Sequence, residues 1–108
     1  MRPVVYIACP YAADPVGNVE RAKGYCRFAL DEGAIPVCPI VYLPQFMSEE
    51  TERDLATSID MVFLLRCDEV WVMGDTISAG MKDEIALARE SQMRIRYFGS
   101  DLKEVRHR

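Results

Sequence analysis

Glu84 is a carboxylate in a stretch where the residue spacing predicts burial. At about 100° of rotation per residue, the helix expected over residues 78–92 gathers Met81, Ile85 and Ala88 on one apolar face. Glu84 falls inside that arc, where an ionised carboxylate must be paired, hydrogen-bonded or shifted in pKa. Such a group, close to the start of a helix at the mouth of a cleft, suits catalysis. The alternative is a glutamate at the edge of the buried face that reaches solvent or pairs with an arginine.

Asp60 is a second carboxylate in apolar surroundings. It is the only charged residue in the run Ile-Asp-Met-Val-Phe-Leu-Leu, which extends from Ile59 to Leu65. Two carboxylates on elements that flank one cleft are the minimum set for glycosyl-transfer chemistry. A buried structural aspartate that caps a loop is the alternative.

Ser78 and Gly80 stand at the start of the same helix as Glu84. Glycine is unfavourable in a helix unless something approaches the backbone closely, and free N–H groups at a helix N-terminus bind phosphate or hydroxyl groups. Simple capping by Ser78 is an equally good explanation. The spacing from Gly74 to Gly80 does not match a P-loop, and the dinucleotide pattern G-x-G-x-x-G is absent from the sequence.

Aromatic residues form a further group of candidates. Tyr6 interrupts an otherwise apolar strand, and Tyr11, Tyr42 and Phe46 lie in segments that are expected to be loops. A flat apolar slot with one or two hydroxyl groups suits a nucleobase. Ordinary wall aromatics without a ligand are the alternative for the three loop residues.

Helices and strands must position these candidates. Along the chain, apolar runs alternate with segments whose apolar residues have helical spacing. Strands are expected at residues 4–8, 34–38, 70–73 and 95–98, with the last at an edge of the sheet. Helices are expected at 16–31, 50–66 and 78–92, with a short helix after Ser100. Runs that are apolar on both sides fit strands covered on both faces. The order predicts one doubly wound α/β domain over residues 1–108, with a four- to five-stranded parallel sheet between helices. Its ligand is expected at the carboxyl ends of the strands, in segments 9–18, 39–47 and 74–80.

The composition excludes several classes of function. The net charge of −4 argues against a nucleic-acid partner, and no apolar run is long enough to span a bilayer. The four cysteines form no C-x-x-C pair, and the single histidine, His107, stands next to the C-terminus. We therefore expect no metal site and no catalytic triad. Unpaired thiols and the lack of a signal-peptide pattern predict a cytoplasmic protein.

Together these residues resemble the nucleoside 2-deoxyribosyltransferase superfamily, in particular its small single-domain members and the phage and bacterial proteins grouped with them. The matching pieces span about residues 4–98: Val4-Val5-Tyr6-Ile7-Ala8, then Asn18, Asp60, Cys67-Asp68-Glu69-Val70-Trp71-Val72, and Ser78-x-Gly80-x-x-x-Glu84-Ile85.

The resemblance implies a flavodoxin-like, three-layer fold and cleavage of an N-glycosidic bond in a nucleoside or nucleoside 5′-monophosphate. Glu84 would attack C1′ of the sugar, Tyr6 would orient Glu84, and Asp60 would help to protonate the departing base or hold the sugar. Ser78 would hold the 5′ end of the sugar or its phosphate. The implied enzyme needs no cofactor and is expected to be a homodimer. The complete set of expected substrate-binding residues is Cys9, Tyr11, Asn18, Tyr42, Phe46, Ser78 and Gly80.

Two features of the sequence keep other functions open. The first loop, Cys9-Pro10-Tyr11-Ala12-Ala13-Asp14, lacks the Gly/Arg-rich character of phosphate-binding relatives, and Met81 replaces a threonine often found after the glycine. One alternative is therefore a catalytically silent module that binds or senses a nucleotide. Another is an electron carrier with flavin mononucleotide, although the first loop also lacks the Ser/Thr-rich phosphate cradle of such proteins.

Overall fold

Helices and strands alternate along most of the chain in the computed structural model, which describes residues 1–106. The elements are β1 (Val4–Ala8), α1 (Pro15–Asp31), β2 (Ile35–Val37), two 3₁₀ turns η1 (Pro39–Val41) and η2 (Leu43–Gln45), α2 (Arg53–Leu65), β3 (Glu69–Met73), α3 (Ala79–Glu90), β4 (Arg94–Phe98) and β5 (Glu104–Val105). The expected helices and first four strands are thus present, with ends that differ by up to three residues. His107 lies outside the described residues.

The strands form one sheet in the order β2-β1-β3-β4-β5. β1 to β4 are parallel, and β5 pairs with β4 in the antiparallel sense, with Tyr97 opposite Val105. The expected flavodoxin-like, doubly wound α/β fold is confirmed, with five strands of which four are parallel.

The expectation of a short helix after Ser100 is wrong, and so is the placement of β4 at an edge. A tight turn, closed by the hydrogen bond from Gly99 N to Lys103 O (3.0 Å), reverses the chain and returns it along β4 as β5. Arg96 of β4 then forms two hydrogen bonds with Glu104, at 2.9 and 2.7 Å. This cross-strand ion pair holds the short strand in place. Arg96 and Glu104 are eight residues apart in the sequence, whereas side chains that meet on a helix are three or four residues apart, so a helix in this segment would not bring them together.

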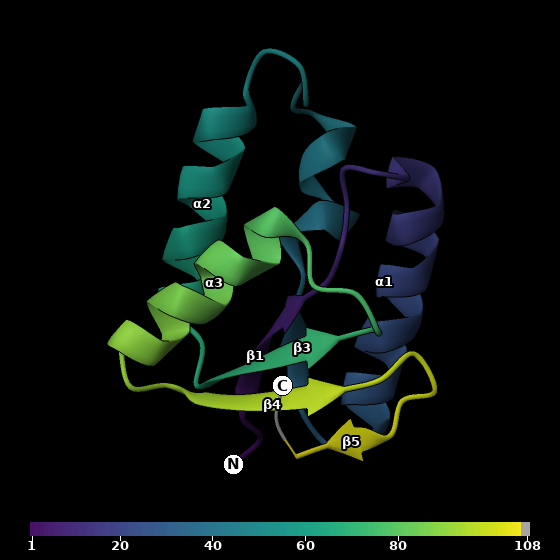
Figure 1. Ribbon diagram of the computed structural model, residues 1–108, viewed down its shortest axis with the longest axis vertical. Coiled ribbons are helices and arrows are strands. Elements are labelled where there is room, and N and C mark those ends of the chain that lie inside the picture. The colour runs from purple at the N-terminus through teal and green to yellow at the C-terminus, as the bar shows by residue number, and fades with distance from the viewer. Residues whose placement is uncertain (107–108) are drawn as a thin grey trace.

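Each face of the sheet is covered, which gives three layers. Alternate strand residues point to opposite faces, so Val5 and Ile7 of β1 pack with α1, whereas Tyr6 and Ala8 pack on the side of α2 and α3. Figure 1 shows α1 on one side of the sheet and α2 with α3 on the other. Tyr6 is therefore the one polar-tipped residue of β1 that faces α3.

Prolines determine the conformation of β2 and of the segment after it. Pro36 leaves β2 only three residues long at the edge of the sheet, and Pro39 and Pro44 each lie in the first turn of a 3₁₀ helix. The chain therefore forms two successive tight turns before α2, at the carboxyl end of the sheet. None of the described helices is both long and apolar enough to cross a membrane.

Candidate active site

The central pair of the candidate site is Tyr6 of β1 and Glu84 of α3. Glu84 lies in the second turn of α3 on the face that packs against the sheet, and it is only 9% exposed. The Tyr6 hydroxyl, 2% exposed, donates a hydrogen bond to Oε2 of Glu84. The buried carboxylate predicted from the helix spacing is thus hydrogen-bonded by a residue 78 positions away in the sequence.

Burial dominates the electrostatics of this pair. Loss of solvation raises the pKa of Glu84 to about 7, and the charges of Asp60 and Asp83 act in the same direction. The hydrogen bond from Tyr6 opposes the increase because it stabilises the carboxylate. Burial and the nearby Glu84 also raise the pKa of the Tyr6 phenol far above its usual value. Tyr6 is therefore a permanent donor, and Glu84 changes its charge near neutral pH.

Asp60 of α2 supplies a second carboxyl group within electrostatic range of both Tyr6 and Glu84. Its Oδ1 atom is buried and has no hydrogen-bond partner among the described residues. Burial, followed by the charge of Glu49, raises its pKa to about 6. A buried acceptor without a partner destabilises a fold by about 1–3 kcal/mol, so a carboxyl group of this kind at a cavity favours a role in binding or catalysis over a structural one.

The cavity beside Asp60 has a volume of about 380 Å³, including the part open to solvent. Its wall comes from the loop after β1, the 3₁₀ turns and α2. The lining residues are Tyr11, Ile40, Leu43, Pro44, Met47, Ser48, Glu49, Ala56 and Asp60. A mostly apolar cleft with a few polar groups is typical of a site for a small organic molecule.

Among the residues predicted from the sequence, Tyr11 and Asp60 belong to this lining. Tyr6 and Glu84 do not line the cavity. Asp60 connects them to it, because Asp60 lies in the lining and its charge acts on both residues. Tyr42 and Phe46 lie elsewhere, since they are exposed and stack on each other with 5.7 Å between ring centroids.

The two 3₁₀ turns explain this division. Ile40 and Leu43 are three residues apart, a spacing that puts side chains on one side of a 3₁₀ segment, and they form the cavity wall together with Met47. Tyr42 and Phe46 lie outside the bounds of both turns and are exposed. The sequence interpretation missed the wall residues. The three-residue spacing of Ile40 and Leu43 could have indicated a shared side, but only if the segment is known to be helical. Glu49, whose charge acts on Asp60, was also missed and carries no such signal.

Ser78 and Gly80 occupy the N-terminus of α3. The Ser78 hydroxyl accepts a hydrogen bond from the backbone N–H of Met81 at 3.3 Å, so Ser78 caps the helix. Gly80 is exposed, and a Cβ atom at this position would meet nothing within 4 Å. Among residues 1–106, no neighbouring group requires a glycine at this position, and the space above it is open.

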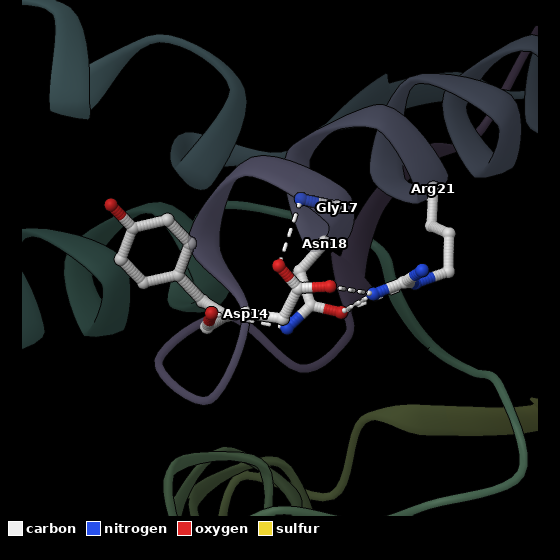
Figure 2. Close-up of polar contacts among 5 residues, drawn as sticks. Asp14, Gly17, Asn18 and Arg21 are labelled. Atoms are coloured by element: carbon white, nitrogen blue, oxygen red, sulfur yellow. Dashed lines mark hydrogen bonds and ion pairs between the residues drawn. The ribbon is translucent and has the colours of Figure 1, made fainter.

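Asn18 braces the first loop (Figure 2). Its side chain is buried, donates from Nδ2 to the carbonyl oxygen of Tyr11 at 3.0 Å, and accepts from Arg21 at 2.8 Å. Arg21 also bonds the carboxylate of Asp14 at 3.1 Å, and Asp14 accepts from the N–H of Gly17 at the start of α1. The network fixes the backbone of the loop that carries Tyr11, and the sequence did not single out Asp14, Gly17 or Arg21 as members of it.

Cys9 lies in the core beneath α1, on the opposite side of the sheet from Glu84. Within residues 1–106, no group of three or more His, Cys, Asp and Glu residues is arranged to hold a metal ion.

Two solved structures with a similar fold are 2-deoxyribosyltransferases. The enzyme from Bacillus psychrosaccharolyticus matches with a TM-score of 0.65 at 20% sequence identity, over 96% of this chain and 77% of that one. The enzyme from Leishmania mexicana matches with a TM-score of 0.64 at 14% identity, over 90% of this chain and 64% of that one. At these identities the likeness shows a shared fold, and the chain spans only part of the length of each neighbour.

Comparison at the level of sequence is more restricted. No curated protein sequence matches the chain significantly. Residues 3–98 match the model of a family described as "Domain of unknown function (DUF7768)", which is most of the chain. The protein therefore belongs to the DUF7768 family, and its fold is that of the 2-deoxyribosyltransferases.

Proposed function

We propose that this protein cleaves the N-glycosidic bond of a nucleoside or a nucleoside 5′-monophosphate, and passes the sugar to water or to a second base. The observation that carries the proposal is the buried Glu84–Tyr6 pair with Asp60 beside it at the cavity. The fold shared with 2-deoxyribosyltransferases supports the same chemistry.

Glu84 is the proposed nucleophile. Because Tyr6 occupies Oε2, Oε1 is the oxygen that attacks C1′ of the sugar. The C1′–O bond forms as the C1′–N bond breaks, and the electron pair of that bond leaves with the base. Attack by water or a second base on C1′ then releases Glu84, so two displacements give retention of configuration.

Asp60 is the proposed proton donor. Its raised pKa of about 6 keeps a fraction of it protonated near neutral pH, and it lines the cavity in which the base would lie. After it has protonated the departing base, Asp60 is the base that takes a proton from the incoming water or acceptor. The scheme requires neither a metal ion nor an organic cofactor.

The remaining residues of the proposed site bind the substrate or hold the surrounding loop in place. Tyr11 and the apolar wall formed by the 3₁₀ turns contact the base, and Asn18 holds the Tyr11 backbone. Ser78 and the open backbone at Gly80 receive the 5′ end of the sugar or its phosphate, where the N-terminus of α3 favours negative charge.

We also propose that the protein acts as a homodimer. Leu55 and Val62 of α2 are 52% and 56% exposed and stand seven residues apart, so they form one stripe on the side of the helix opposite buried Leu64. Tyr42 and Phe46 extend the apolar surface at the end of α2, where Tyr42 packs on Phe63. In this arrangement Cys9, Tyr42 and Phe46 have no direct contact with the substrate.

A chromatographic assay for free base tests the enzymatic proposal. Wild-type protein should release base from one or more members of a panel of nucleosides and 5′-monophosphates, whereas Glu84→Gln should lose at least about a thousandfold in rate. Glu90→Gln is the matched control, since Glu90 is an exposed glutamate on the same helix, and it should retain full activity.

Two outcomes would contradict the proposal. Equal base release by wild type and Glu84→Gln would exclude Glu84 as the nucleophile. Saturable nucleotide binding without base release from any substrate would identify a silent binding module instead.

A further inference from the structure

Three of the four cysteines come together beneath α1. Cys9 follows β1, Cys26 lies in the middle of α1, and Cys38 follows β2. All three belong to the core on this side of the sheet, where Cys9 and Cys38 are buried and Cys26 is partly exposed. The thiol of Cys38 interacts with the thiols of both Cys26 and Cys9, so the three side chains lie close together in this core.

The cysteine cluster is connected to the cavity by short stretches of backbone. Cys9 is two residues before Tyr11, and Cys38 is two residues before Ile40, and both of these neighbours line the cavity. Cys38 is also close enough to Tyr6 to contribute to the increase in the pKa of that phenol. A displacement of Cys38 would therefore reach the cavity wall and the partner of Glu84 together.

The three thiols differ in reactivity. Cys26 is the one that solvent reaches, because Cys9 and Cys38 are buried. The hydrogen bond from Cys38 lowers the pKa of the Cys26 thiol, and a thiolate is the form that reacts with oxidants. Cys38, the donor in that bond, keeps its proton and stands in contact with the sulfur that reacts first. A partly exposed thiol with a lowered pKa beside a second thiol is typical of a redox-sensitive pair.

We propose that Cys26 and Cys38 form a reversible disulfide when the protein meets a hydroperoxide, and that this bond impairs the adjacent cavity. The second half of the proposal rests on the function proposed above, whereas the first half does not. Cys67, which lies on the other side of the sheet and donates to the carbonyl oxygen of Phe63 at 3.2 Å, takes no part.

The chemistry balances with hydrogen peroxide as the oxidant. The Cys26 thiolate attacks one peroxide oxygen, an S–O bond forms, the O–O bond breaks, and the leaving hydroxide takes a proton to become water. The Cys38 sulfur then attacks the sulfur of the resulting sulfenic acid. The S–S bond forms, the S–O bond breaks, and the proton of Cys38 leaves with the hydroxide as a second water. Two thiols have lost two electrons to one peroxide, and a dithiol reductant reverses the process by exchange.

The bond would move the wall of the cavity. Two thiols in contact must approach to about 2.05 Å between sulfur atoms to form a disulfide. This draws Cys38 toward α1, and the turn Pro39–Val41 begins at the next residue. Because a misplacement of about 1 Å lowers the rate of a positioned reaction by up to about a hundredfold, we expect the oxidised protein to release base at least about tenfold more slowly.

Peptide mapping tests the disulfide directly. Cleavage after Lys and Arg, except before proline, places the four cysteines in four separate peptides, namely 1–21, 24–27, 28–53 and 67–82. After peroxide treatment, alkylation of free thiols and digestion, peptide 24–27 should be linked to 28–53, and the other two cysteines should carry the alkyl group. Four alkylated cysteines, or a link from 1–21 to 28–53 in place of the expected one, would overturn the assignment.

Variants and activity separate this inference from the proposed function. Cys26→Ser should abolish the link, and Cys67→Ser, the matched control on the other side of the sheet, should retain it. If wild type forms the link and loses base release until a reductant is added, both proposals stand. Base release without a link refutes the disulfide alone. A link in a protein that releases no base in either state refutes the enzymatic proposal and the loss of activity, and leaves the modification site.

Discussion

Ionisation of Glu84 lowers the stability of the fold but is required for the proposed activity. Its folded-state pKa of about 7 is higher than its ordinary value of 4.5, so the folded state binds this proton more tightly than the unfolded state. The stability it contributes is fully present below about pH 4.5 and is lost as pH rises through about 7. The ionised group needed for nucleophilic attack is therefore the form that the fold disfavours.

Glu84→Gln should consequently be more stable than wild type at alkaline pH. The substitution keeps an acceptor for Tyr6 and removes the buried charge, so we expect a gain on the order of 2–3 kcal/mol in the free energy of unfolding at pH 8. The gain should shrink as the pH falls and vanish near pH 4.5. Urea denaturation of both proteins across this range measures it, and a pH-independent difference would show that Glu84 does not titrate with the expected pKa.

The dependence of kcat/KM on pH should have two limbs. Glu84 must be ionised to attack, so the rate should fall below about pH 7, and Asp60 must be protonated to assist the base, so the rate should fall above about pH 6. The maximum lies between these values, and the apparent pKa values belong to the interacting pair. Asp60→Asn should remove the alkaline limb. A rate that does not change between about pH 4 and 8 would exclude a carboxylate nucleophile.

Tyr6→Phe should move the acid limb to higher pH. The hydrogen bond from Tyr6 lowers the pKa of Glu84, and its loss leaves burial unopposed. The apparent pKa of the acid limb, taken from kcat/KM profiles of the two proteins, measures the shift. A lower rate with an unchanged profile would mean that Tyr6 acts in another way, such as on the substrate.

At the scale of elements, the N-terminus of α3 is capped by Ser78 but carries a glycine two residues later. Gly80→Ala should stabilise the protein by about 0.5–1 kcal/mol, because alanine favours the helix and its Cβ meets nothing within 4 Å. If the sugar or phosphate lies against this backbone, KM should rise severalfold while kcat changes little.

Gly24→Ala is the matched control for that prediction. Gly24 is exposed within α1, and a Cβ there also meets nothing within 4 Å. It should give the same gain in thermal unfolding without a change in KM. An unchanged KM in both variants would remove Gly80 from the proposed binding site.

At the scale of the whole molecule, the exposed apolar stripe on α2 predicts a dimer. Wild-type protein should sediment with twice the 12.3 kDa mass of the chain, and Val62→Glu should sediment as a monomer because it places a charge in the middle of the stripe. Val16→Glu is the control, since Val16 is an exposed valine on α1. A wild-type monomer, or a dimer in Val62→Glu, would contradict this interface.

The amino-acid sequence determined the features that depend on neighbouring residues. Apolar runs without alternation predicted parallel strands covered on both faces, and helical spacing placed Glu84 in a buried face. Both predictions agree with the structure, because periodicity reports which side of an element is covered. Asp60 was singled out in the same way, as the one charge in an apolar run.

Only the tertiary structure decided which distant residues meet. The hydrogen bond between Tyr6 and Glu84 requires β1 to lie centrally in the sheet and α3 to cross it. The contact among Cys9, Cys26 and Cys38 requires α1 to pack over the ends of β1 and β2. Strand order and helix placement depend on the packing of the whole core, and local spacing along the chain carries no record of them.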